Sequence, residues 1–241
     1  MYNYVMKLSV VVPAYNEKST LESILARVKE VDFSDTPELP DIEKEIIIID
    51  DCSTDGTTQI LQELQKSDPD IVVIFKKTNE GKGFALRDGF RKTTGDYVIV
   101  QDADLEYDPN DFKKLLRAVV EDGADVVYGS RFSGTYKDMS NLHYYGNKIL
   151  TIITNIFFGV LLTDMETCYK LMPGKFARQV EIKSARFNFE PEITAKILKS
   201  GLKIVEVPIS YQGRSHNEGK KITWRDGLSA LFTLIKFRFT N

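Results

Sequence analysis

Cysteine and histidine are scarce in this sequence, and their scarcity excludes two kinds of architecture. The 241 residues include two cysteines, Cys52 and Cys168, and two histidines, His143 and His216. Two cysteines are too few for a disulfide framework, so a reducing compartment such as the cytoplasm is the expected setting. The histidines lie far apart in the sequence, which argues against a metal site built mainly from imidazole ligands.

The sequence also lacks an excess of positive charge and any long hydrophobic run. Its formal net charge is −3, whereas a general nucleic-acid binder is usually basic. The first residues, Met1 to Lys7, do not have the basic and apolar regions of a signal peptide. The most apolar stretch, residues 149–162, is interrupted by polar residues and is shorter than the roughly 18 residues of a spanning helix. The composition is typical of a globular protein with one large domain or two small ones.

What the sequence does contain is a series of short, continuously apolar segments. They predict strands over residues 7–12, 45–49, 71–75, 96–101, 125–128 and 203–207. The intervening segments predict helices over residues 20–31, 57–66, 84–93, 109–121, 142–162, 189–200 and 222–239. Pro13 and Pro208 are expected to end their strands, and residues 129–132 to form a loop. Strands that are apolar throughout and alternate with helices predict an α/β fold, with a mostly parallel sheet covered on both faces.

Polar residues follow three of the predicted strands. Tyr15 and Glu17 follow the first, Asp50 and Asp51 the second, and residues 102–106 the fourth. Ligands of parallel sheets bind beyond the carboxyl ends of the strands, so these residues are expected to converge there. A response-regulator receiver domain also has an acidic pair at a strand end. That pair follows its first strand, where this chain has Pro13 to Tyr15, so the receiver interpretation is disfavoured.

The acidic residues Asp102, Asp104 and Glu106 are the strongest of these signals. Alternate residues of an extended chain point the same way, and a curl at the strand end can turn all three carboxylates toward one ion. Hard oxygen ligands suit Mg²⁺ or Mn²⁺, and such an ion usually accompanies phosphates. The plainer alternative is a capped turn that carries three solvated acids.

Motifs along the chain resemble those of the GT-A fold glycosyltransferases of family 2. In the first half they are Val-Val-Pro-Ala-Tyr-Asn-Glu17, Ile-Asp-Asp-Cys-Ser-Thr-Asp-Gly-Thr57, Asn-Glu-Gly-Lys-Gly83 and Gln-Asp-Ala-Asp-Leu-Glu106. The second half resembles the polyprenyl-phosphate (dolichyl-phosphate) mannose and glucose synthases in Gly-Ser-Arg131, Thr-Asp-Met-Glu-Thr-Cys-Tyr-Lys170, Phe-Asn-Phe-Glu190, Val-Glu-Val-Pro-Ile209 and Arg214 to Lys220. The last loop, Arg214 to Lys221, departs from the Arg-x-x-Gly-Glu-Ser-Lys pattern common in that branch. The C-terminal transmembrane helices of some relatives are not part of this sequence.

The resemblance implies a single GT-A (Rossmann-like) domain over residues 1–241. Residues 1–130 would form the nucleotide-sugar-binding half, and residues 131–241 the acceptor-binding half with amphipathic helices. The implied reaction is the inverting, metal-dependent transfer of a hexose from GDP-mannose or UDP-glucose to a polyprenyl phosphate. Asp104 and Glu106 would hold Mg²⁺ or Mn²⁺. The expected nucleotide-sugar ligands are Pro13, Ala14, Tyr15, Glu17, Ile49, Asp51, Lys82, Asp102, Ala103, Arg131, Arg214 and Lys220. The expected catalytic residues are Asp102, Asp104, Arg131 and Asp164.

The identity of the acceptor stays open at the level of sequence. A lipid phosphate is already anionic and requires cations rather than a base, and Arg131 suits it, with Arg214 and Lys220 closing over the donor. A sugar hydroxyl, as in capsule or lipopolysaccharide assembly, requires a carboxylate to accept its proton, and Asp164 is the candidate. A non-catalytic protein that binds nucleotide sugars is a third alternative, which the complete set of acids and cations disfavours.

The two most apolar predicted helices, residues 142–162 and 222–239, suit peripheral contact with a membrane. Lys148, Lys236 and Arg238 lie where cations would meet the bilayer surface, which would be its cytoplasmic face. The alternatives are that these helices cover the sheet or form a homodimer interface.

Overall fold

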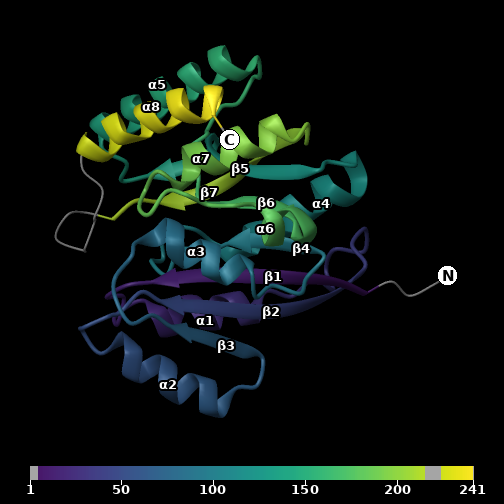
Figure 1. Cartoon of the computed structure of the whole chain (residues 1–241). Coiled ribbons are helices and arrows are strands. Elements are labelled where there is room, and N and C mark those ends of the chain that lie inside the picture. The colour runs from purple at the N-terminus through teal and green to yellow at the C-terminus, as the bar shows by residue number, and fades with distance from the viewer. Residues whose placement is uncertain (1–4, 215–223, 241) are drawn as a thin grey trace.

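The computed structural model describes residues 5–214 and 224–240, and its centre is a seven-stranded sheet in the order β3-β2-β1-β4-β6-β5-β7 (Figure 1). Neighbouring strands run parallel except at β6, which is antiparallel to both β4 and β5. The prediction of a mostly parallel sheet is confirmed. The strands are β1 (Val5–Ala14), β2 (Asp41–Asp50), β3 (Ile71–Phe75), β4 (Tyr97–Val100), β5 (Val126–Lys137), β6 (Lys170–Pro173) and β7 (Ile204–Gln212).

Helices cover both faces of the sheet, as predicted. α3 packs against β1 and β2 and beside α6, while α4 packs against β5 and β7 and η1 contacts both α1 and α4. Beyond the β5–β7 end of the sheet, α5 and α8 lie side by side over α7 (Figure 1). The helices are α1 (Leu21–Glu30), α2 (Thr57–Ser67), α3 (Lys82–Phe90), the 3₁₀ turn η1 (Pro109–Asp111), α4 (Phe112–Asp122), α5 (Asn141–Phe158), α6 (Gly174–Gln179), α7 (Phe189–Lys199) and α8 (Trp224–Phe239).

The central strands are buried on both faces because their side chains are apolar throughout. Val98 to Val100 of β4 and Val10 to Val12 of β1 are inaccessible to solvent, as expected for the middle of a parallel sheet. The register aligns Ala14 of β1 with Asp50 of β2 and Val11 of β1 with Val100 of β4. The carboxyl ends of these three strands therefore meet at one edge, and the polar motifs that follow them meet there too.

Two predicted strand ends at proline were wrong. β1 continues through Pro13 to Ala14, and β7 continues through Pro208 to Gln212. β1 pairs with β4 only as far as Val11, so Pro13 has a neighbouring strand on one side alone. β7 is an edge strand, so Pro208 also has a neighbouring strand on one side alone. Proline is tolerated at such positions because no partner there requires its missing N–H.

The prediction also misplaced the end of β5 and missed β6 and α6. Residues 129–132, expected as a loop, belong to β5, which runs on to Lys137 with an irregularity between Ser130 and Thr135. β6 has four residues and pairs antiparallel with both neighbours. A segment of this length carries no usable periodicity, so its pairing could not be read from the local pattern.

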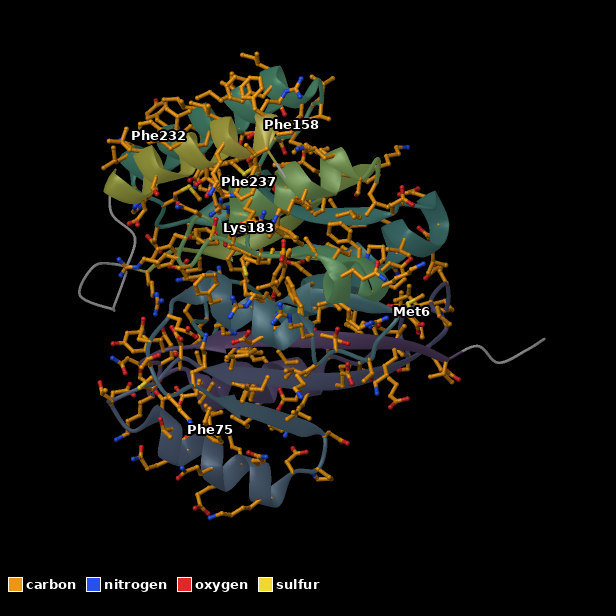
Figure 2. The ribbon with its side chains drawn as sticks, viewed as in Figure 1. Met6, Phe75, Phe158, Lys183, Phe232 and Phe237 are labelled. Carbon is orange, nitrogen blue, oxygen red and sulfur yellow. The ribbon has the colours of Figure 1, made fainter. Side chains whose placement is uncertain are left out.

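α5 and α8 each bury one face and expose another. Leu150 of α5 and Ala230 and Leu234 of α8 form a small core with Leu162 and Met165. Figure 2 shows Phe237 of α8 on the side of α7, where it is buried, whereas Phe232 is 71% exposed. The apolar face expected for the last helix is therefore largely the exposed one. Among the described residues, no helix has the length and apolarity to cross a membrane.

Candidate functional site

A cavity of about 630 Å³ opens where the polar strand-end motifs meet α5 and α8. One end is lined by charged residues of the sheet edge, including Lys82, Asp102, Asp104 and Arg131. α5 and α8 line the other end with mostly apolar residues, namely Leu142, Ile149, Leu150, Ile153, Leu228, Ala230 and Leu231, together with the polar His143, Asn147 and Asp226. The cavity can therefore surround the polar part of a ligand with charged side chains and its apolar part with hydrocarbon side chains.

Asp102 is held by Lys82, the first residue of α3. Lys82 Nζ lies 2.9 Å from Asp102 Oδ1 and 2.9 Å from Glu190 Oε1 of α7. Although burial opposes it, the two carboxylates raise the pKa of Lys82, and Lys82 lowers the pKa of Asp102 against the effect of burial. Glu190 was not among the predicted site residues. Its acidic position in the first turn of a predicted helix was the available signal, but a helix-capping role explains that position equally well.

The loop before Lys82 packs closely against residues 184–185. A Cβ at Gly83 would lie 2.0 Å from the Ser184 carbonyl oxygen, and one at Gly81, whose φ is +91°, would lie 2.4 Å from that of Ala185. Gly83 N–H donates to the Ala185 carbonyl at 2.9 Å. The Gly-Lys-Gly motif thus needs its glycines for backbone contact, and this contact fixes the start of the helix that carries Lys82.

Asp104 and Glu106 face a different cation, Arg214. Arg214 Nη2 lies 3.0 Å from Asp104 Oδ2, Arg214 N–H donates to Glu106 Oε1 at 3.0 Å, and Nη1 lies 3.1 Å from Glu17 Oε2. Tyr211 also donates its hydroxyl to Glu106 at 2.8 Å. Asp102, Asp104 and Glu106 therefore do not turn toward one point, as a simple curl of the strand end predicted, but divide between Lys82 and Arg214.

The chemistry of this acid cluster fits a divalent cation. Burial, together with the charges of Asp102 and Glu106, raises the pKa of Asp104 to about 7 even though Arg214 opposes the shift. Carboxylates that raise each other's pKa in this way attract a small cation, and their oxygens are the ligands that Mg²⁺ and Mn²⁺ prefer. Among the described residues, no group of three or more His, Cys, Asp or Glu is already arranged as a metal site. Arg214 would have to move aside for Asp104 and Glu106 to bind a metal.

The remaining predicted residues of the first half divide between cavity wall and core. Pro13, Ala14, Tyr15, Glu17, Asp51 and Ala103 line the cavity. Asp51 accepts the backbone N–H groups of Glu80 and Gly81 at 2.9 and 2.7 Å, so it also positions the glycine loop. Ile49 is not on the wall. It is fully buried, and its Cδ1 lies 2.5 Å from where a Cβ at Gly89 would be, so it packs in the core beneath α3.

Arg131 and Asp164 form a buried ion pair beside the cavity. Asp164 accepts three hydrogen bonds from Arg131, from the backbone N–H at 3.0 Å, Nε at 2.7 Å and Nη2 at 2.8 Å. Asp164 is inaccessible to solvent and is not among the cavity-lining residues, whereas Arg131 is. The structure thus brings Arg131 to the site and holds Asp164 behind it. Lys220 lies outside the described residues.

The family of the chain follows from comparison with known proteins. The sequence profile described as "Glycosyl transferase family 2" matches residues 9–180. A dolichol-phosphate mannosyltransferase of Pyrococcus furiosus is 31% identical over 221 residues, which cover 89% of this chain and 59% of that protein. An undecaprenyl-phosphate mannosyltransferase of Micrococcus luteus is 28% identical, with 89% and 87% covered. This chain thus spans less than two thirds of the length of the Pyrococcus protein.

Solved structures share the fold at low sequence identity. Glucosyl-3-phosphoglycerate synthase from Mycobacterium tuberculosis, solved with Mn²⁺, UDP and glucosyl-3-phosphoglycerate, aligns with a TM-score of 0.70 at 18% identity over 98% of this chain and 81% of that one. A mannosyltransferase from Pyrobaculum calidifontis, solved with GDP-mannose and Mn²⁺, aligns with a TM-score of 0.59 at 18% identity over 87% and 57%. The fold is that of these GT-A enzymes. Together with the profile match over most of the chain, it establishes that the protein belongs to glycosyl transferase family 2.

Proposed function

We propose that this protein transfers a hexose from a nucleotide sugar, GDP-mannose or UDP-glucose, to the phosphate of a polyprenyl phosphate, with inversion at the sugar carbon. The observation that carries the proposal is the two-ended cavity. A polyprenyl phosphate is a charged head on a hydrocarbon chain, and the cavity joins a charged wall to the apolar walls of α5 and α8. The names of the Pyrococcus and Micrococcus relatives support the same acceptor class.

The donor would bind at the sheet edge, with its base near Tyr15 and its diphosphate near Asp104 and Glu106. These two carboxylates would hold Mg²⁺ or Mn²⁺, which when bound neutralises charge on the leaving diphosphate. Asp102 and Lys82 would orient the donor, since Lys82 holds Asp102 and is itself held by Glu190. Arg214 would exchange its carboxylate partners for the donor phosphates and, with Lys220, cover them.

The acceptor phosphate would bind Arg131. Three nitrogens of Arg131 are engaged by Asp164, and Nη1 is the guanidinium nitrogen with no hydrogen bond to a described residue. A phosphate is anionic at neutral pH, so it can attack the sugar carbon without giving up a proton to a base. Asp164 supports this choice of acceptor, because a buried carboxylate bound by an arginine is poorly placed to accept a proton from a sugar hydroxyl.

The exposed faces of α5 and α8 would rest on the membrane that holds the acceptor. Their exposed apolar side chains recur at helical spacing and continue from the cavity wall to the surface, at Leu142, Tyr145, Ile149, Ile152 and Ile156 of α5 and at Leu228, Phe232, Ile235 and Phe239 of α8. Apolar faces of this kind bind the interface of a bilayer. Residues 1–130 would then serve the donor and residues 131–241 the acceptor, within one domain.

The test is nucleotide release and lipid-linked sugar formation by the purified protein with Mn²⁺ or Mg²⁺. Each donor is offered with a polyprenyl phosphate, with the matching polyprenol that lacks the phosphate, and with no acceptor. We expect transfer with the phosphate alone. Transfer to the polyprenol, or to a sugar acceptor but not to the phosphate, would replace this proposal with a hydroxyl-acceptor enzyme. Absence of acceptor-dependent release with every donor and acceptor would reject it.

The membrane part is tested separately by flotation with vesicles that contain anionic lipid. The protein should float with them, and Phe232→Asp should reduce the floating fraction, whereas Val72→Asp on the distant strand β3 should not. A protein that stays at the bottom of the gradient and forms a dimer in solution would instead assign the α5 and α8 faces to a second copy.

A further inference from the structure

Glu166 is a half-buried acidic residue of the cavity, and one of its carboxyl oxygens has no hydrogen-bond partner among the described residues. It lines the cavity, and its Oε1 is shielded from solvent without a partner among the described residues. Leaving a buried polar atom unpaired costs about 1–3 kcal/mol. Glu166 is part of the Thr-Asp-Met-Glu-Thr-Cys-Tyr-Lys170 motif, but neither the donor nor the acceptor argument above uses it. A ligand group that pairs with Glu166 when the ligand binds would account for the unpaired oxygen.

The segment that carries Glu166 is fixed on both sides. Lys170, which is inaccessible to solvent, donates through Nζ to the carbonyls of Met165 and Thr167 that bracket Glu166. Met165 N–H donates to Thr151 at 3.0 Å, and the Thr167 hydroxyl donates to the Gly129 carbonyl at 2.6 Å. The backbone around Glu166 is therefore held in place while its carboxyl group is not. That is the arrangement expected of a preorganised binding residue.

The neighbours of Glu166 define what kind of ligand group it can accept. Glu190, which binds Lys82 on the donor side, and Arg131, on the acceptor side, both influence the pKa of Glu166. Glu166 lines the same cavity as Lys82 and Glu190, placed on the donor side, and Arg131, assigned to the acceptor phosphate, so the transferred sugar would lie within its reach. In its ionised form the carboxylate would repel a phosphate, and the nearby Lys170 and Arg131 disfavour a metal cation. A neutral hydroxyl group is the remaining partner.

The protonation of Glu166 is consistent with this partner. Burial, together with the charge of Glu190, raises the pKa of Glu166 to about 8. A carboxyl group that carries its proton at neutral pH both donates and accepts a hydrogen bond, as a sugar hydroxyl does.

We infer that Glu166 binds a hydroxyl group of the transferred sugar and determines which hexose the protein accepts. The inference rests on the proposed function in so far as the ligand is a nucleotide sugar, but it does not depend on the identity of the acceptor. Sites built to hydrogen-bond a substrate hydroxyl discriminate strongly against analogues that lack it, because the site group is then left unpaired.

The experiment is a binding cycle by calorimetry in the presence of Mn²⁺ and without acceptor. Wild type, Glu166→Ala and Glu166→Gln are titrated with GDP, UDP, GDP-mannose, UDP-glucose and the four monodeoxy forms of the hexose donor that binds. Glu121→Ala, on the exposed end of α4, controls for removal of a glutamate side chain outside the cavity. In the wild type, one deoxy donor should bind about tenfold more weakly than its parent. Glu166→Ala should weaken the parent by a similar factor and show no further loss for that deoxy donor, while Glu166→Gln retains most of the affinity.

Two controls separate a sugar-binding role from a structural one. Affinity for the nucleoside diphosphate without sugar should be unchanged in all variants, and Glu166→Ala should melt no lower than wild type, since it removes an unpaired carboxylate. The inference is overturned if Glu166→Ala keeps every deoxy penalty, loses nucleoside diphosphate affinity equally, or fails to fold. Failure of the wild type to bind any hexose donor would overturn both proposals. Donor binding with the predicted cycle, but no transfer to a polyprenyl phosphate, would reject the acceptor and leave the role of Glu166 intact.

Discussion

Replacing Asp164 by Asn separates a structural role from a catalytic one. Asp164 accepts three hydrogen bonds from Arg131, and the side chains of both residues are buried, with relative exposures of 7% for Arg131 and 0% for Asp164. Asn has nearly the same volume, but it carries no charge and has one acceptor oxygen in place of two. Arg131 would be left as a buried guanidinium without a counter-charge, the situation that makes breaking a buried ion pair cost about 3–5 kcal/mol.

A loss of this size is readily measured. Domains have unfolding free energies of about 5–15 kcal/mol, so the variant should lose about a fifth or more of its stability. For a chain of this length about 2–4 °C of melting temperature corresponds to each kcal/mol, which gives an expected decrease of about 6–20 °C. The assay is equilibrium unfolding in urea, followed by circular dichroism, for the wild type and Asp164→Asn. Asp125→Asn is the matched control. The exposed Asp125 accepts a single hydrogen bond, from Lys203 N–H at 2.9 Å, and should change stability by less than about 0.5 kcal/mol.

A second variant isolates the pair from the site. Arg131→Met combined with Asp164→Leu replaces the two charges with apolar side chains and should recover most of the stability lost in Asp164→Asn, because it leaves no unpaired charge. The reasoning is refuted if Asp164→Asn unfolds within about 1 kcal/mol of wild type. If that stable variant also bound its donor but lost turnover by several orders of magnitude, Asp164 would be a general base and the acceptor a hydroxyl.

Three further variants probe other features. Although partial burial opposes it, hydrogen bonds from Ser9 and Thr94 lower the pKa of Glu45 to about 2. The stabilisation that Glu45 contributes is therefore complete above its unfolded pKa and is lost as the pH falls toward 2. In urea unfolding, Glu45→Gln should be less stable than wild type by about 1–2 kcal/mol at pH 7, after allowance for solvent screening, and the difference should shrink between about pH 4.5 and 2. Gly83→Ala should lower the unfolding free energy by about 1–3 kcal/mol, because its Cβ would meet the Ser184 carbonyl. Gly146→Ala in α5 is the control: its Cβ would meet nothing within 4 Å, so it should not destabilise the protein. Equal effects of the two substitutions would contradict the close packing at Gly83. In calorimetry without nucleotide, Arg214→Met should bind Mn²⁺ about tenfold more tightly than wild type, because the cation no longer has to displace the guanidinium from Asp104 and Glu106. Substitution of the exposed Arg91 by Met should leave Mn²⁺ binding unchanged. Weaker Mn²⁺ binding by Arg214→Met would show that these acids are not the metal ligands.

The edge at which the motifs meet was predictable because its cause is local. Each strand is a short apolar run, and each run is followed by its own polar segment, as at Asp50 and Asp102. Parallel pairing then brings the carboxyl ends together whatever the detailed register, so the convergence of Glu17, Asp51 and Asp102 on one cavity needed no knowledge of distant contacts. For the same reason the short strand β6, which has no local pattern, was missed.

The partners of the charged residues were not predictable because they come from far along the chain. Lys82 meets Glu190, 108 positions away, and Arg214 meets Glu17, 197 positions away. Nothing in the sequence around Asp104 indicates that an arginine from the last loop would pair with it. A curl that turns the three acids toward one ion is a reasonable prediction from local sequence. In the folded chain, three clustered carboxylates would repel one another, whereas separate ion pairs with Lys82 and Arg214 are attractive.

The balance of charge in the cavity determines the order in which ligands can bind. Among the described residues, eight acidic residues, of which Glu166 is protonated at neutral pH, line it against four lysines and arginines: Glu17, Asp51, Asp102, Asp104, Glu106, Glu166, Glu190 and Asp226, and Lys82, Arg131, Arg186 and Arg214. Lys82, Arg131 and Arg214 each already bind a carboxylate of the protein. A diphosphate that entered alone would meet an excess of negative charge and would have to displace these carboxylates. A diphosphate that enters with a divalent cation meets acids that its own cation can bind, and Arg214 is then released to the phosphates. We therefore expect the cluster of Asp104, Glu106 and Arg214 to favour a metal–diphosphate complex over either component, and a nucleoside diphosphate should bind only weakly when the divalent cation is chelated.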